Sequence, residues 1–273
     1  MPTQRREIFI PKPKIEKVAF IIPGQGGQKS GMYNLANRVD YIAEAYEQTD
    51  EEIEKLYGAE GINGRNISEW AEHGTEDELA DTRVTQPLLV ATAVGLIDYI
   101  TKTRRITADT VAGHSLGGLP ALYAGGSLEK TDTLKLGIKR GQITYDTSLN
   151  HEGRMIALSN VTHMTQEFLD SINLGEIFGI VRAIRNSPDQ VLLAGLKHII
   201  EEKRDEWQRL LRAAKGMSKE EKRLLPQVAV MKIKGGFHSF LMSGAEKAFL
   251  TELQPIPLKP PYRKIPFWLY RKI

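Results

Sequence analysis

Val111-Ala-Gly-His-Ser-Leu-Gly-Gly118 is the most informative segment of this 273-residue chain. Within it, Gly113 to Gly117 fit the pattern Gly-x-Ser-x-Gly, a sharp strand-to-helix turn that lifts a serine hydroxyl above a sheet. The apolar residues before the turn predict the end of a buried strand, and residues 119–123 predict the helix that follows. Ser115 is therefore a candidate nucleophile. The alternative is a glycine-rich turn with an incidental serine.

Strands and helices are predicted to alternate on both sides of this turn. The expected elements are strands at residues 15–22 and 109–112 and helices at residues 41–57, 86–99 and 131–146. Thr131 or Asp132 is the expected N-cap of the last helix. Such alternation predicts an α/β fold with a mostly parallel sheet, covered by helices on both faces.

The pattern changes after about residue 150. Strands are expected at residues 155–161, 177–184, 190–194 and 227–233, and helices at residues 165–172 and 197–215. The order β-α-β-β-α-β is that of the split βαβ unit found in ferredoxin-like folds. We therefore expect a large α/β-hydrolase-like subdomain, residues 16–150 and 233–273, with a ferredoxin-like small subdomain inserted at residues 151–232.

The composition excludes several classes of function. The chain has no cysteine, so disulfides, thiolate zinc sites and a cysteine nucleophile are excluded. A net charge of +3 gives no reason to expect nucleic-acid binding. We find no signal-peptide core and expect no apolar run of membrane-spanning length, which favours a cytoplasmic protein. Basic residues gather between Lys259 and Lys272, either as ordinary solvated surface or as a docking face for an acidic partner.

A serine hydroxyl needs an adjacent base before it becomes a good nucleophile. Among the six histidines, His238 stands out because it follows Gly235-Gly236 at the end of a predicted strand. Catalytic loops commonly occupy such positions. His114 precedes Ser115 directly, so its side chain is expected to point elsewhere. His238 is therefore the preferred candidate for the base.

The intermediate of acyl transfer also needs donors that stabilise its oxyanion. One expected donor is the main-chain N–H of Leu116, the residue after the nucleophile. The other is expected from Pro23-Gly-Gln-Gly-Gly-Gln28, a glycine-rich loop after the first strand. A phosphate-binding loop is the rival interpretation, but the segment lacks both the Walker lysine and the Gly-x-Gly-x-x-Gly spacing.

Six motifs in a fixed order give the chain a resemblance to a known family. They are Val18-Ala-Phe-Ile-Ile-Pro-Gly-Gln-Gly-Gly-Gln28, Gln86-Pro-Leu-Leu89, Gly113-His-Ser-Leu-Gly117, Lys139-Arg-Gly141, Asn186-Ser-Pro-Asp-Gln190 and Gly236-Phe-His-Ser-Phe-Leu-Met242. In this order they resemble the malonyl-CoA:acyl carrier protein transacylases and the stand-alone acyltransferases that serve polyketide synthases. The resemblance runs from about residue 16 to residue 266.

The resemblance implies a role for each matching residue. Ser115 is expected to take the acyl group from coenzyme A as an ester, and His238 to act as its base. The other implied roles are the oxyanion hole for the main-chain N–H groups of Gln25 and Leu116, binding of the malonyl carboxylate for Arg140, and the pocket lining for Gln86 and Asn186. A guanidinium suits the carboxylate because its fork can hold both oxygens.

The function implied is transfer of a malonyl group from malonyl-CoA to the phosphopantetheine thiol of an acidic acyl carrier protein. The route is ping-pong through the seryl ester, with no cofactor and no metal. We expect no nucleic-acid or membrane partner, and a monomer. The pathway served, fatty acid or polyketide synthesis, is left open by the sequence.

One departure from the family supports an alternative function. After Pro266 the family continues through further helices and a last strand, whereas this chain ends in Phe267-Trp-Leu-Tyr-Arg-Lys-Ile273. In the family, that section supplies a main-chain group that orients the catalytic histidine. A truncated or non-catalytic relative that keeps carrier-protein binding is therefore one alternative. A serine esterase or acyl hydrolase is a second alternative, because it would share the Gly-x-Ser-x-Gly turn, although it would not require the glycine-rich loop or Arg140.

Overall fold

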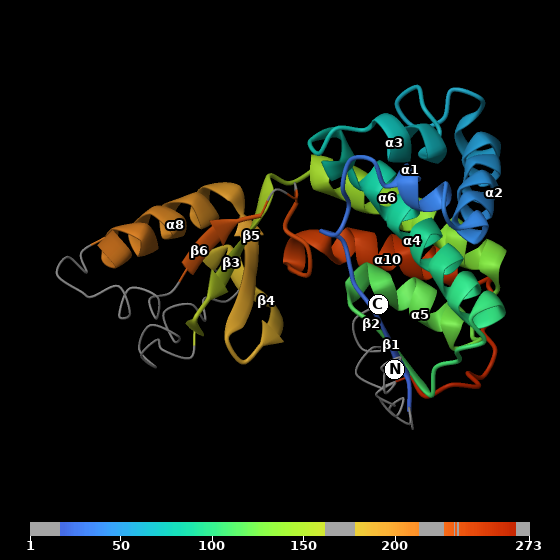
Figure 1. Ribbon diagram of the computed structural model, residues 1–273. Coiled ribbons are helices and arrows are strands. Elements are labelled where there is room, and N and C mark those ends of the chain that lie inside the picture. The colour runs from blue at the N-terminus through green and yellow to red at the C-terminus, as the bar shows by residue number, and fades with distance from the viewer. Residues whose placement is uncertain (1–16, 162–177, 213–226, 232, 234, 266–273) are drawn as a thin grey trace, which may run out of the picture.

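The computed structural model describes residues 17–161, 178–212, 227–231, 233 and 235–265. Its elements form two groups (Figure 1). One group consists mainly of helices around a short parallel sheet. The other is a four-stranded antiparallel sheet with one long helix along a face. We call them the helical unit and the small unit.

The helical unit contains most of the helices. Its elements are β1 (Ala19–Ile22), α1 (Tyr33–Ala36), α2 (Asp40–Tyr57), α3 (Ile67–His73), α4 (Thr82–Asp98), β2 (Thr110–Gly113), α5 (Gly118–Ala124), α6 (Lys130–Leu149) and α10 (Ser243–Leu253). α4 packs between α2 and α6 and carries buried side chains on nearly every face. Tyr46 of α2 lies in this core and shares a 2.8 Å hydrogen bond with Thr92 of α4.

The length of α4 corrects the expectation that no apolar run reaches membrane-spanning length. Together with the π-helical turn Tyr99–Thr103, it forms a 22-residue helix with a mean hydropathy of 1.3 over its most apolar window, long and apolar enough to cross a membrane. However, 67% of that window is buried inside the protein. Its apolar surface is thus already covered by α2 and α6, as in a core helix.

The start of α6 corrects a second expectation, which concerns the residue at its N-cap. Glu129, in extended conformation, is the N-cap, and its carbonyl accepts hydrogen bonds from the main chain and the hydroxyl of Thr133. Thr131 and Asp132 lie inside the first turn instead. A carboxylate there is still favourable, because the helix N-terminus carries a partial positive charge.

β1 and β2 pair in parallel, with Ile22 opposite Gly113. Parallel strands end at the same edge of a sheet, so the glycine-rich loop after β1 and the turn after β2 emerge side by side. The parallel direction agrees with the sequence prediction. Lys264 continues the pairing through a parallel bridge to Thr110, at the opposite end of β2.

The small unit contains β3 (Gly153–Ser159), β4 (Ile180–Ser187), β5 (Gln190–Leu196), α8 (Lys197–Arg212) and β6 (Gln227–Val230). Its sheet has the order β4-β5-β3-β6, and neighbouring strands are antiparallel. The β4–β5 hairpin turns where the sequence predicts it. The predicted helix at residues 165–172 and the end of the one at residues 197–215 lie outside the described residues.

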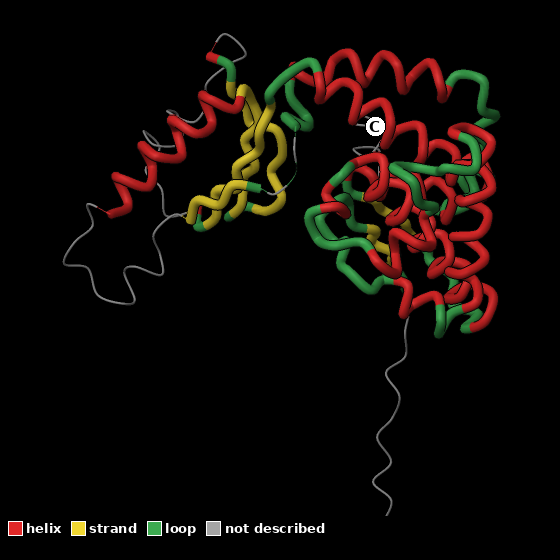
Figure 2. The backbone as a smooth tube through the Cα atoms, turned by 90° about the horizontal axis from the view of Figure 1, so that it is seen from above, coloured by secondary structure: helices red, strands yellow, loops and turns green. Residues whose placement is uncertain are grey.

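The two faces of this sheet have different partners. One face packs against α8 (Figure 2). Trp207 and Ile200 of this helix join a cluster with Ile156 and Leu193. The other face carries a second cluster of buried residues, namely Met155, Ala183, Leu192, Ala194, Ile233 and Phe237. Because Phe237 immediately precedes His238, this second face turns toward the candidate site.

Candidate active site

Ser115 sits on a turn that only its flanking glycines allow. β2 ends at Gly113, a short 3₁₀ turn covers residues 115–117, and α5 begins at Gly118. A Cβ atom on Gly113 would collide with the carbonyl of Gly117, and one on Gly117 would collide with the carbonyl of Ile22. Ser115 itself has a φ of +51°, a strained value for a serine. Such strain is typical of residues held for a function.

His238 contacts this serine. Its Nε2 lies 2.9 Å from Ser115 Oγ, although the two residues are 123 positions apart. His238 lies on the loop after β6 and has a φ of +58°. The loop packs so closely on β3 that a Cβ atom on Gly153 would collide with the main-chain nitrogen of Gly236. The structure therefore brings together the predicted nucleophile and the predicted base at hydrogen-bond distance.

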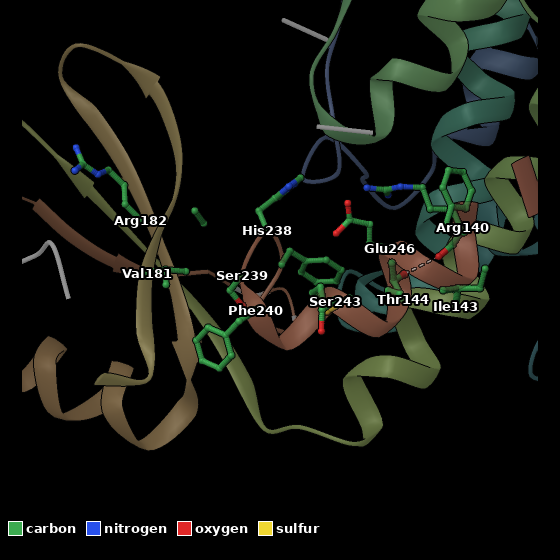
Figure 3. A pocket seen from close by; sticks show the side chains of 15 residues that line it. Arg140, Ile143, Thr144, Val181, Arg182, His238, Ser239, Phe240, Ser243 and Glu246 are labelled. Carbon is green, nitrogen blue, oxygen red and sulfur yellow. Dashed lines mark hydrogen bonds between the residues drawn. The ribbon is translucent and has the colours of Figure 1, made fainter. Parts of the chain in front are cut away.

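Arg140 extends from α6 to the same place. Its Nη2 donates to Ser115 Oγ at 3.3 Å, and its Nη1 donates to Gln86 Oε1 at 2.8 Å. Burial lowers the pKa of Arg140 to about 10, because a charged guanidinium is poorly solvated there. Within the described part of the chain, no carboxylate lies within ion-pair distance of Arg140. In Figure 3, Arg140 and His238 point toward one another across a gap.

Gln86 links Arg140 to the glycine-rich loop. Its side chain is fully buried, and its Nε2 donates to Thr144 Oγ1 at 3.0 Å and to Gln25 Oε1 at 3.4 Å. The predicted pocket residue Gln86 thus contacts the cationic group directly.

The glycine-rich loop lies against the turn that carries Ser115, as the parallel pairing of β1 and β2 requires. A Cβ atom on Gly24 would lie 2.7 Å from the carbonyl oxygen of His114 and 3.5 Å from the Cβ of Ser115. Gly24 therefore has to be a glycine for this close approach. Within the loop, the main-chain N–H of Gly26 donates to Gln28 Oε1 at 2.9 Å. Gln25 is held next to the nucleophile by this arrangement.

Two cavities meet at these residues. The smaller has a volume of about 60 Å³ and lies between the residues Ser115 and His238 and the sheet of the small unit. Its lining comprises Gln25, His114, Ser115, Arg140, Met155, Ile184, Leu192, Met231, Ile233, Phe237 and His238. A larger cleft of about 540 Å³ runs between β4 and the helices α6 and α10. Arg140, Phe237 and His238 line both cavities, so the cleft leads to the smaller one.

Asn186 does not join the other predicted site residues. It lies exposed at the end of β4, and its Nδ2 donates to Gln190 Oε1 at 2.8 Å across the hairpin. Its place in the small cavity is taken by Ile184, which the sequence analysis did not single out. The pairing of β4 with β5 is irregular on both sides of Ile184. Such bulges redirect side chains, so strand alternation alone does not reveal Ile184.

A serine on a strained strand-to-helix turn, in contact with a histidine and beside a buried arginine, defines an α/β enzyme of the serine-nucleophile class. Residues 19–272 match the acyl transferase domain family. The chain belongs to this family and is therefore an acyltransferase.

The relatives and solved structures agree with that assignment. The chain is 30% identical to a polyketide biosynthesis malonyl CoA-acyl carrier protein transacylase of Bacillus velezensis, over 87% of this chain and 72% of the relative. It is 31% identical to the malonyl CoA-acyl carrier protein transacylase of Synechocystis, over 87% and 69%. The crystal structure of the transacylase from Burkholderia pseudomallei superposes with a TM-score of 0.71 at 25% identity, covering 91% of this chain and 76% of that one.

Proposed function

We propose that this protein transfers a malonyl group from malonyl-CoA to the phosphopantetheine thiol of an acyl carrier protein through an ester on Ser115. The observation that carries the proposal is Arg140, a buried cation 3.3 Å from the nucleophile with no carboxylate partner among the described residues. The names of the relatives, malonyl CoA-acyl carrier protein transacylases, support the same substrate pair.

The acyl group follows from the charge of Arg140. A desolvated guanidinium without an anion is costly, so the site favours an acyl group that brings its own carboxylate. Acetyl or a long alkyl chain would leave the charge buried and unpaired. The apolar wall of a cavity of only about 60 Å³ further favours a short acyl group.

Acylation begins when Ser115 Oγ attacks the thioester carbonyl carbon. The hydroxyl proton passes to His238 Nε2, which lies at 2.9 Å from the oxygen. The tetrahedral oxyanion is held by the main-chain N–H groups of Gln25 and Leu116. Collapse of the intermediate breaks the carbon–sulfur bond, and the leaving thiolate of coenzyme A takes the proton from His238.

Transfer reverses these steps with a new thiol. The phosphopantetheine thiol gives its proton to His238, and its sulfur attacks the seryl ester carbonyl. Collapse then returns the proton to Ser115 Oγ and releases malonyl thioester on the carrier protein. The 540 Å³ cleft that ends at His238 is the proposed path for both pantetheine arms. No oxidant, metal or cofactor takes part.

The finer description of the fold is also our inference. The strand order β4-β5-β3-β6, with α8 on one face, supports a ferredoxin-like small subdomain at residues 151–232. The remaining residues, 16–150 and 233–273, form the proposed α/β-hydrolase-like subdomain. An acidic carrier protein, a monomeric state and a cytoplasmic location remain predictions.

Incubation with malonyl-CoA tests the proposal. We expect a covalent malonyl adduct that maps to Ser115 by peptide mass spectrometry and disappears when acyl carrier protein is added. The Ser115→Ala variant is the control and should stay unmodified. Absence of the adduct in a folded sample would refute the function. Steady release of free malonate without a carrier protein would instead indicate a hydrolase.

A further inference from the structure

The side chain of Gln25 has an N–H group whose use is not explained by the steps above. Gln25 Nε2 is buried and has no hydrogen-bond partner within the described part of the protein. The residue lines the small cavity together with Ser115 and Arg140. Buried donors are almost always paired in folded proteins, so an unpaired one beside a nucleophile suggests a missing ligand.

The donor–acceptor chemistry of the neighbours fixes which end of this amide is unpaired. Arg140 can only donate hydrogen bonds, so Gln86 must present its Oε1 to Arg140. The Nε2 of Gln86 then faces Gln25, which must accept with its Oε1. Only the Nε2 of Gln25 is left over. The orientation of both amides therefore follows from Arg140, because a guanidinium cannot accept a hydrogen bond.

Two donors consequently converge on one small cavity. Gln25 Nε2 and the guanidinium of Arg140 both belong to its lining, and Gln86 ties the two side chains together. One donor is neutral and one is charged, and a carboxylate can engage both because it has two acceptor oxygens. A neutral acyl group would leave Gln25 Nε2 without an acceptor and the charge of Arg140 without an anion.

We propose that the Gln25 side-chain amide is a specificity-determining group that donates a hydrogen bond to the distal carboxylate of the acyl group. One carboxylate oxygen accepts from Gln25 Nε2 and the other from Arg140. This inference rests on the proposed function, since it assumes a dicarboxylic acyl group. It assigns the side chain of Gln25 a role separate from that of its main-chain N–H.

The thioester carbonyl is the other acceptor available in such a site. It is expected to be served by main-chain N–H groups at the turn. The Gln25 side chain, by contrast, is bonded to Gln86 and so extends toward Arg140. Hydrogen bonds to charged acceptors are also stronger than those to neutral ones. These arguments favour the carboxylate.

Equilibrium binding of two inert CoA analogues tests the assignment. In both, an amide N–H replaces the thioester sulfur, so the carbonyl is kept and transfer is blocked. One analogue ends in a carboxylate, as in malonyl-CoA, and the other in a methyl group, as in acetyl-CoA. Calorimetry gives the Kd of each for the wild-type protein, for Gln25→Met and for the matched control Gln142→Met. Gln142 lies on α6 but lines neither cavity, and its Nε2 donates only to Asp146 Oδ1 among the contacts that the structure shows.

We expect Gln25→Met to weaken binding of the carboxylate analogue by about tenfold to a hundredfold. This is the loss of affinity typical of a hydrogen bond to a charged group. The Kd of the methyl analogue should change less than threefold, and Gln142→Met should preserve the wild-type ratio of the two Kd values. Gln25→Glu should weaken the carboxylate analogue further by like-charge repulsion.

Three results would overturn the assignment. Equal losses of affinity for both analogues in Gln25→Met would indicate that the Gln25 amide binds the carbonyl. No loss of affinity for either analogue would show that the amide does not bind the substrate. An altered ratio in Gln142→Met would show that the preference does not depend on the Gln25 amide in particular. If the wild-type protein does not prefer the carboxylate analogue at all, the proposed function itself fails, which is a separate outcome.

Discussion

At the scale of single residues, Arg140 has the most unusual environment in the site. Burial holds its pKa at about 10, below the ordinary value of 12.5. The empty folded site therefore penalises the charged guanidinium at neutral pH, and the penalty fades as the pH rises through about 10. A bound carboxylate has the opposite effect, because it favours the charged form and raises the pKa.

This linkage predicts a pH dependence of binding. Affinity for the inert carboxylate analogue should be nearly constant between pH 7 and 9, as far as Arg140 is concerned, and should fall about tenfold per pH unit above about 10. The methyl analogue should lack this decline above pH 10. Calorimetric titration across this range, with circular dichroism to verify folding, makes the comparison. An equal decline for both analogues would show that Arg140 does not hold the carboxylate.

The sequence signals for the site residues differ in kind. Ser115 and His238 were found from local patterns, a Gly-x-Ser-x-Gly turn and a glycine pair after a strand, and the structure places them 2.9 Å apart. Arg140 has no local signal, because an arginine on a helix usually faces solvent. The role of Arg140 is implied by the family resemblance alone. Its position depends on contacts with Gln86 of α4 and with Ser115 on the turn after β2, which a single sequence does not encode locally.

At the scale of elements, β4 forms part of the wall of the small cavity beside Ser115. Its two pairing irregularities with β5 flank Ile184, and Ile184 lines the cavity with other apolar residues of the small unit. Branched aliphatic side chains at this wall limit the space next to Ser115. We therefore expect the strand to limit the size of the acyl group and Arg140 to select its charge.

We predict that Ile184→Ala shifts selectivity toward α-branched acyl groups. Removing three carbons from a hydrophobic wall should raise the rate of ethylmalonyl loading relative to malonyl loading at least tenfold, since one methylene in such a pocket is worth about 1–3 kcal/mol. Competition between the two CoA thioesters, read by mass spectrometry of the seryl esters, gives the ratio.

Ile199→Ala is the matched control for this change. Ile199 is also half-buried, but it lies on α8 against the opposite face of the sheet. Both variants should lose stability, by up to about 2–5 kcal/mol. If Ile199→Ala changes selectivity as much as Ile184→Ala does, the effect is general loosening of the small unit and not the shape of the wall.

The elements themselves were predictable where apolar periodicity is long. α2, α4 and α6 were expected within four residues of their observed starts because each spans several turns with a buried stripe. α3 is short and was missed. Its signal was present as a capping box, in which Asn66 and Glu69 bond to each other's main chain. Register irregularities such as those in β4 have no comparable sequence signature.

At the scale of the whole molecule, the site and the basic stretch lie at opposite ends of β2. The described part of that stretch, residues 259–264, reaches β2 at Thr110, whereas Ser115 follows the other end of the strand. Lys259 also forms an ion pair with Glu129. The stretch is therefore poorly placed to guide a carrier protein into the cleft.

Charge reversal distinguishes the two surfaces. The double variant Lys259→Glu, Lys264→Glu should change the KM for acyl carrier protein less than twofold at low salt. Arg182→Glu, on the cleft wall formed by β4, should raise that KM about tenfold, with the effect shrinking as salt is added. Steady-state transfer assays at two ionic strengths measure both. A large effect of the double variant alone would move the docking face to the basic stretch.

The separation of Ser115 and His238 by 123 residues has a consequence for the chain before it is fully folded. The small unit lies between them in sequence, so the histidine reaches the serine only after the chain has passed through β3, β4, β5 and β6 and returned. A partly folded chain thus has a turn with an unactivated hydroxyl. We therefore expect that loss of structure in the small unit alone removes reactivity toward thioesters, even where the turn that carries Ser115 stays intact.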